Sequence, residues 1–110
     1  YYNGWWFMLD IDMEIRNGIL FVRFDGVINK NTSSKLNNLI SMIKYYGIKY
    51  LVYNFSNLLS IDKNGYKSLL SGYDAVVNNS GKVYVVENQF NLDYFVSVKN
   101  ELAALKLLNI

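Results

Sequence analysis

With 110 residues and a mass of 12.8 kDa, the chain is long enough for one small domain and too short for a second core. Apolar residues make up 52% of the chain and charged residues 18%, which predicts a folded domain. The chain has no Cys, His or Pro, which excludes disulfides, thiol or imidazole catalysis, and zinc sites built on Cys or His. Its 11 basic and 9 acidic residues are scattered along the chain and leave a net charge of +2, which argues against a nucleic-acid-binding face.

The chain opens with an aromatic segment, Tyr1–Phe7, whose residues flank an Asn-Gly pair that favours a turn. Two interpretations stay open: a short extra hairpin that covers an apolar patch, or a leader upstream of a start at Met8. We therefore expect an N-terminal extension over residues 1–10, which need not be native, and a domain over residues 11–110.

An antiparallel hairpin is predicted over Ile11–Asp25. Apolar and polar residues alternate in both halves of this segment, which is the period of a half-buried strand. Asn17-Gly18 stands between the halves and is the strongest two-residue hairpin signal, because both positions tolerate a positive φ.

After residues 29–32 the apolar period becomes that of a helix. Asn31 or Thr32 can cap its start, and Gly47 suits the left-handed position beyond its end. The run Tyr50–Phe55 is then typical of a parallel strand covered on both faces. The face of the helix expected to be buried comprises Leu36, Leu39, Ile40, Ile43 and Tyr46.

A second helix is predicted from Asp62, a good N-cap, to about Asn79, with Gly81 closing it. A glycine within it, Gly72, is expected to permit close packing against the sheet. The buried stripe is expected to hold Tyr66, Leu69, Leu70, Tyr73, Val76 and Val77.

The rest of the chain reads as a strand, a loop, a short apolar piece and a helix. Lys82–Glu87 is typical of a buried strand, the polar loop Asn88–Asp93 follows, and Tyr94–Val98 is the apolar piece. A final helix starts at Asn100. Its inward side chains are expected to be Leu102, Leu105 and either Leu108 or Ile110.

The predicted order is β-β-α-β-α-β-β-α, an α/β fold. It implies a mixed sheet of about five strands, with an N-terminal antiparallel hairpin and a parallel centre, and three main helices joined by right-handed crossovers. Ligands and partners of such sheets meet the loops at the carboxyl ends of the parallel strands. A site is therefore expected at residues 27–32, 56–64 and 88–93.

The loop before the second helix contains two residues of interest. Asp62 is explained by helix capping alone, since its negative charge suits the positive end of the helix dipole. Gly65 is harder to explain, because a glycine inside a helix is less stable than alanine by about 1 kcal/mol. A bare backbone there would let another chain or a phosphate approach the free amides.

The order and spacing of the predicted elements from Ile11 to about Ile110 resemble those of the STAS domain, and more narrowly those of the bacterial anti-sigma factor antagonists. The resemblance rests on an apolar hairpin ending in Phe24-Asp25-Gly26, then a helix, a buried strand and Ile61-Asp62-Lys63-Asn64-Gly65 opening a second helix. These motifs are short and moderately specific, so the agreement in order and spacing carries most of the resemblance.

Family members typically have Asp-Ser-Ser/Thr-Gly where this chain has Asp-Lys-Asn-Gly, and Gly-Glu-Leu-Asp where it has Gly-Val-Ile-Asn. The second hydroxyl of the first motif is the family's phosphorylation site, modified by a partner anti-sigma factor that is also a kinase. Here Asn64 occupies that position, and an amide cannot be phosphorylated. Lys63 replaces the first Ser, Asn29 replaces the acid, and residues 87–93 are too few for the helix the family usually has there.

The resemblance implies a non-enzymatic regulatory module, without a cofactor, that binds an anti-sigma factor or serine kinase. A phosphate would add about −1.5 to −2 charges and repel an acidic or tightly packed partner, so a neutral Asn64 is expected to keep the surface competent for binding. The oligomeric state stays open. The predicted partner-binding residues are Asn29, Lys30, Asn31, Ser60, Asp62, Lys63, Asn64, Gly65 and Lys67.

Two other classes of function remain open. Lys30, Lys63 and Lys67 with nearby helix amides can form a weak anion or nucleotide site, although the chain lacks the glycine-rich phosphate motifs. The second class is a scaffold or a subunit of a transport complex. For this class, Trp5, Trp6 and Phe21 are expected to form an exposed aromatic patch for interaction.

Catalysis and membrane insertion have little support in the sequence. The carboxylates Asp25, Asp62 and Asp93 come nearest to a catalytic cluster, but each has a turn or cap role.

No apolar stretch approaches the roughly 20 residues that span a bilayer, so we expect a cytoplasmic protein without a membrane span.

Overall fold

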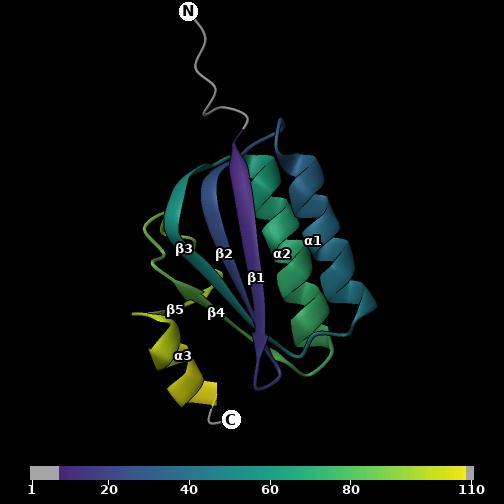
Figure 1. The fold of residues 1–110 in the computed structure, drawn as a ribbon, viewed down its shortest axis with the longest axis vertical. Coiled ribbons are helices and arrows are strands. Elements are labelled where there is room, and N and C mark those ends of the chain that lie inside the picture. The colour runs from purple at the N-terminus through teal and green to yellow at the C-terminus, as the bar shows by residue number, and fades with distance from the viewer. Residues whose placement is uncertain (1–7, 109–110) are drawn as a thin grey trace, which may run out of the picture.

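The computed structural model describes residues 8–108, which form a five-stranded mixed sheet and three helices (Figure 1). The predicted fold class and element order are confirmed. The aromatic opening, residues 1–7, lies outside the described residues, so the N-terminal extension stays a prediction. The strands are β1 (Leu9–Arg16), β2 (Ile19–Ile28), β3 (Tyr50–Ile61), β4 (Lys82–Val86) and β5 (Val96–Val98), and the helices are α1 (Ser33–Tyr45), α2 (Lys63–Asn78) and α3 (Glu101–Leu108).

The strands follow one another across the sheet in chain order, from β1 at one edge to β5 at the other. β1 pairs antiparallel with β2, and every other neighbouring pair is parallel. The turn between β1 and β2 is the predicted Asn17-Gly18, with φ values of 54° and 78°. The hairpin is therefore confirmed, although its strands extend beyond the predicted ends to Leu9 and Ile28.

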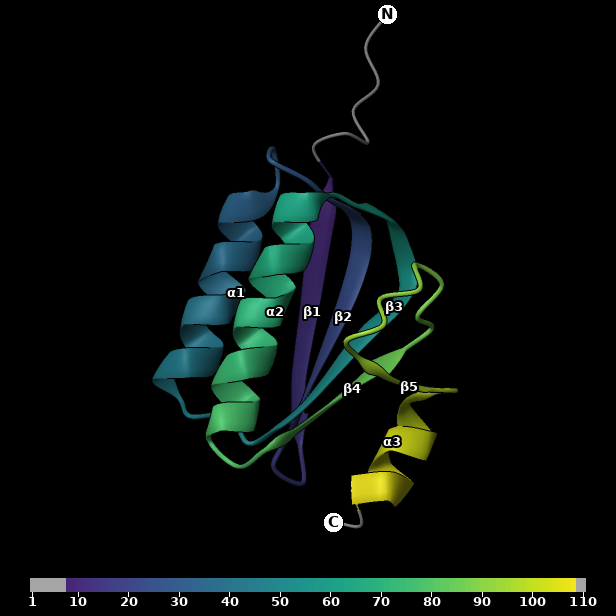
Figure 2. The ribbon, with the colours of Figure 1, turned by 180° about the vertical axis from the view of Figure 1, so that it is seen from behind.

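Helices cover both faces of the sheet: α1 and α2 lie together on one face and α3 lies on the other (Figure 2). The larger core is formed by side chains of α1, α2 and the first four strands. The smaller core joins Ala104 and Leu108 of α3 to Ile19 and Phe21 of β2. The prediction of an exposed Phe21 is wrong, because α3 covers this face of β2 and Phe21 is fully buried.

β3 is longer than predicted and runs to Ile61, so residues 56–61 are strand and not loop. The pairing of β2 with β3 has irregularities between Arg23 and Asp25 and between Gly26 and Val27. The apolar run ends at Phe55 because the next two residues, Ser56 and Asn57, are polar and exposed. The strand continues through these irregularities to Ile61.

Several helix predictions are wrong. Tyr46, Val77 and Leu102 were expected to point inward, but they are 68%, 38% and 59% exposed. The left-handed residue after α2 is Ser80 and not Gly81. Gly81 is needed for another reason, since a side chain there would overlap the backbone oxygen of Lys49. The expected close packing at Gly72 is confirmed, because a Cβ there would overlap the Tyr53 hydroxyl.

An ion-pair network joins α3 to the sheet. The Arg23 guanidinium on β2 donates to both carboxylate oxygens of Glu101 at 2.9 and 2.8 Å, and to Asp12 and Glu14 at 2.9 and 2.8 Å. The Asn54 side-chain amide donates to Glu101 at 2.8 Å. The hydrogen bonds from Arg23 hold the pKa of Glu101 below its ordinary value of 4.5, against a smaller opposing effect of burial.

We expect the network to make stability depend on pH at the acidic end. Because the Glu101 pKa is lowered in the folded state, its contribution is full above the ordinary value of 4.5 and is lost as the pH falls through the folded value. Urea unfolding between about pH 7 and pH 3 should therefore show a shallower loss of free energy for Glu101→Gln than for the wild type. Equal slopes for the two proteins would contradict this assignment.

Candidate functional site

The carboxyl ends of β2 and β3 meet at one edge of the sheet, where the loop before α1 and the start of α2 lie (Figure 1). Ile28 pairs with Ile61 at the ends of the two strands. The backbone N–H of Asp62 then donates to the carbonyl of Ile28 at 2.9 Å. These contacts place residues 29–31 beside residues 60–64, two of the three predicted segments. We call the surface formed by residues 29–31, residues 60–65 and Lys67 the α2-edge surface.

The loop over residues 29–32 is held by a buried hydroxyl. Thr32 is 2% exposed, and its Oγ1 donates to the carbonyl of Val27 at 2.9 Å and accepts from the backbone N–H of Asn29 at 3.0 Å. The Asn29 side-chain oxygen accepts from the backbone of Asn31 at 2.9 Å. Thr32 occupies the N-cap position of α1, as predicted, but its side chain makes no capping hydrogen bond, because the hydroxyl bonds back into the loop.

The predicted cap of α2 is confirmed. The Asp62 carboxylate accepts from the backbone N–H of Gly65 at 2.7 Å. Gly65 is itself buried, and a Cβ there would overlap the Cγ2 methyl of Ile28. The glycine therefore lets α2 pack against the end of β2, and its amide is already bonded. Packing explains this glycine, and it presents no free amide to a partner.

The exposed part of the α2-edge surface is positively charged. Lys30, Lys63 and Lys67 are exposed, and within residues 8–108 none of them forms an ion pair. The one carboxylate among the predicted residues, Asp62, is engaged as the cap. The first turn of α2 adds the positive end of the helix dipole. The remaining residues are the exposed Asn31 and Asn64 and the half-buried Asn29 and Ser60.

The carboxylates singled out in the sequence do not form a cluster among the described residues. Within residues 8–108 there is no group of three or more acidic side chains placed to hold a metal ion. Asp25 and Asp93 are exposed on separate segments, while Asp62 is engaged as the cap. None of the helices in this part of the chain is both long and apolar enough to cross a membrane.

Sequence reasoning did not identify the structural role of Thr32. The signal available was the spacing of Asn29 and Thr32, since Asn and Thr side chains near a chain reversal commonly bond to nearby backbone groups. The same residue is also compatible with a helix cap, and only its distance to the carbonyl of Val27 decides between the two roles.

The family model for the STAS domain matches residues 10–93 of the chain. The chain belongs to the STAS domain family. The STAS match includes β1 to β4, α1, α2 and therefore the whole α2-edge surface. No helix lies in residues 87–95, in agreement with the short segment noted in the sequence.

Solved structures of anti-sigma factor antagonists share this fold at low sequence identity. An anti-sigma factor antagonist from Mycobacterium paratuberculosis is 18% identical, with a TM-score of 0.79 over 94% of this chain and 96% of that one. The anti-sigma factor antagonist SpoIIAA in its unphosphorylated form is 14% identical, with a TM-score of 0.76 over 91% and 98%. The phosphorylated form of SpoIIAA, a Bacillus cell fate determinant, is 15% identical, with a TM-score of 0.69 over 89% and 99%. At these identities the likeness concerns the fold.

Proposed function

We propose that this STAS domain is a non-enzymatic regulatory module that binds an anti-sigma factor of the serine kinase type through the α2-edge surface. The observation that carries the proposal is Asn64, exposed in the first turn of α2 at the position of the family's phosphorylated residue. The fold supports it, since two structures with the same fold are those of one antagonist, SpoIIAA, without and with its phosphate.

The charges of the surface favour an acidic partner. Lys30, Lys63 and Lys67 surround the start of α2 without ion-pair partners among the described residues. Complementary charge on a partner would speed association and select against basic surfaces. Asn64 is neutral at every pH and is no phosphoacceptor, so this surface keeps its charge and binding is constitutive. We place the interaction in the cytoplasm.

Affinity capture from a lysate of the source organism tests the class of partner. The tagged full chain is expected to recover an ATP-binding protein of the anti-sigma kinase type, identified by mass spectrometry. Complex formation should weaken as the salt concentration rises. The reason is that salt screens the attraction between the lysines of the α2-edge surface and the acidic groups of the partner. Recovery of no such protein, or of one whose binding ignores salt, would contradict the proposal.

A further inference from the structure

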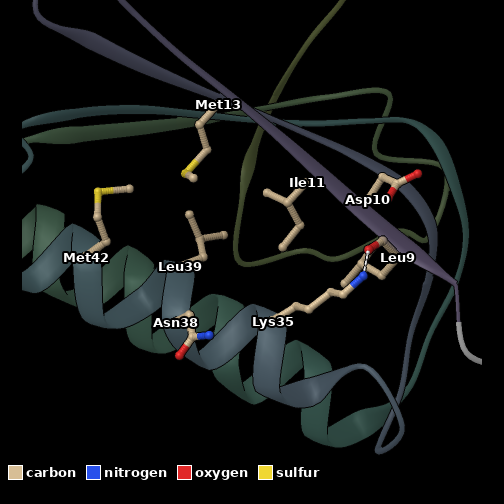
Figure 3. Close-up of a pocket in the computed structure, with 8 residues that line it drawn as sticks. All are labelled: Leu9, Asp10, Ile11, Met13, Lys35, Asn38, Leu39 and Met42. Carbon is tan, nitrogen blue, oxygen red and sulfur yellow. Dashed lines mark hydrogen bonds between the residues drawn. The ribbon is translucent and has the colours of Figure 1, made fainter.

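The outer edge of β1 has no pairing strand among residues 8–108 and lies beside an apolar groove. Within residues 8–108, β1 pairs only with β2. A groove of about 390 Å³ separates β1 from α1, and Figure 3 shows Ile11 and Met13 of β1 pointing into it toward Leu39 and Met42 of α1. Met13 is 49% exposed, although it lies on the core side of the strand. The groove thus leaves apolar side chains partly uncovered.

Along this edge, the backbone of β1 presents hydrogen-bonding groups that no strand among the described residues pairs with. The Met8 carbonyl accepts from Val27 on β2, so it points into the sheet. The polar groups of successive strand residues point to opposite sides, so those of the next residue face outward. Accordingly, the Leu9 carbonyl accepts from the Lys35 ammonium of α1 at 2.8 Å, outside the sheet. The groups left facing outward beyond this contact are those of Ile11, Met13 and Ile15.

The opposite face of β1 is acidic. Asp10 and Asp25 are directly opposite each other in the β1–β2 pairing, and both are exposed. Neither forms an ion pair within residues 8–108, whereas Asp12 and Glu14 are bonded to Arg23. Like charges placed opposite each other in a sheet are destabilising. A second cavity of about 280 Å³ lies at this face, lined by Asp10, Asp12, Arg23, Phe24, Asp25 and Asn57.

We propose that the β1 edge binds an extended segment of a partner protein in which apolar and basic residues alternate. Such a segment would add as a strand, because its backbone can bond to the outward-facing backbone groups of Ile11 and Met13. Successive side chains of a strand point to opposite faces, so its apolar residues would enter the groove while its basic residues would meet Asp10 and Asp25. This surface shares no residue with the α2-edge surface and does not depend on the proposed function.

Charge selects this occupant over a second copy of the chain. On this face β1 carries the acidic row Asp10, Asp12 and Glu14, followed by Arg16 at its end, so two β1 strands paired antiparallel and edge to edge about Asp12 or Met13 would bring the Asp12 carboxylate against Asp12 or Glu14 of the second copy. Charged residues on an edge strand commonly prevent such self-association. The same row attracts a strand of opposite charge, which is what the proposal requires.

The test uses the full chain labelled with ¹⁵N and an acetylated, amidated octapeptide of four Lys-Val repeats as the probe. We expect saturable amide shifts confined to β1 and the facing side of α1, with a Kd on the order of 0.1–1 mM. The matched Glu-Val peptide should cause none. No shift with the Lys-Val peptide, shifts centred on other elements, or equal binding of both peptides would overturn the proposal.

Two variants distinguish binding at the β1 edge from general electrostatic attraction between the peptide and the protein. Asp10→Lys is expected to weaken peptide binding about tenfold or more, whereas Asp74→Lys, the same change on exposed α2, should alter it less than about twofold. Equal affinities for the two variants would overturn the proposal. It would also be overturned if the free protein dimerised through β1, or if residues 1–7 already protected the Ile11 and Met13 amides from hydrogen exchange.

Discussion

Replacing Gly26 with alanine is expected to lower the free energy of unfolding by about 2–5 kcal/mol. Two effects add at this position. Gly26 has a φ of 125°, a backbone conformation that side-chain-bearing residues rarely adopt. A Cβ there would also overlap the backbone oxygen of Met8, which accepts from Val27 and cannot move independently of the sheet. Native domains are stable by only about 5–15 kcal/mol, so the loss is large.

Gly18→Ala is the matched control for Gly26→Ala. Gly18 also has a positive φ, 78°, but nothing lies within 4 Å of where its Cβ would be. It should therefore show only the backbone effect, about 1–2 kcal/mol. Urea unfolding followed by circular dichroism measures both variants. If Gly26→Ala were no less stable than Gly18→Ala, the close approach of Met8 to Gly26 would be wrong.

Gly65→Ala should destabilise the protein by about 1–3 kcal/mol, the opposite of what helix propensity predicts. In an open helix the change would stabilise by about 1 kcal/mol. Here the new Cβ would overlap the Cγ2 methyl of Ile28 and lie 3.3 Å from the Asp62 carboxylate. The start of α2 would have to move away from β2, which would separate the two parts of the α2-edge surface.

A double-mutant cycle tests this assignment. Ile28→Ala removes the Cγ2 methyl, so Gly65→Ala should be less destabilising in that background than in the wild type. Equilibrium unfolding of the wild type, both single variants and the double variant gives the coupling energy. An increase in stability on Gly65→Ala, or strictly additive effects, would contradict the packing of Gly65 on Ile28.

Local features of the sequence predicted much of this fold. Asn17-Gly18 predicted the hairpin because a two-residue turn depends on its own backbone angles. Asp62 predicted the start of α2 because a cap bonds within one helical turn. Features that depend on distant segments could not be read in this way. The burial of Phe21 requires α3, and the full length of β3 depends on its irregular pairing with β2.

The candidate site illustrates the same limit at Gly65. The predicted parallel order of β2 and β3 already brought residues 27–32 and 56–64 to the same end of the sheet, and the bond from Asp62 to Ile28 agrees with this grouping. The sequence suggested a bare backbone at Gly65 open to a partner. The structure instead shows a buried glycine beneath Ile28, a contact that no local pattern predicts.

The central claim is that the partner binds the α2-edge surface, and its most direct test is a comparison of affinities. The affinity of the captured partner is measured by calorimetry, at one salt concentration, for the wild type, Asn64→Asp and Asn78→Asp. Asn64→Asp adds a negative charge to the α2-edge surface, where it also suits the helix dipole and leaves the fold intact. Asn78→Asp makes the same change at the far end of α2. We predict about tenfold weaker binding for Asn64→Asp and less than about twofold for Asn78→Asp. Equal affinities for the two variants would contradict binding through the α2-edge surface.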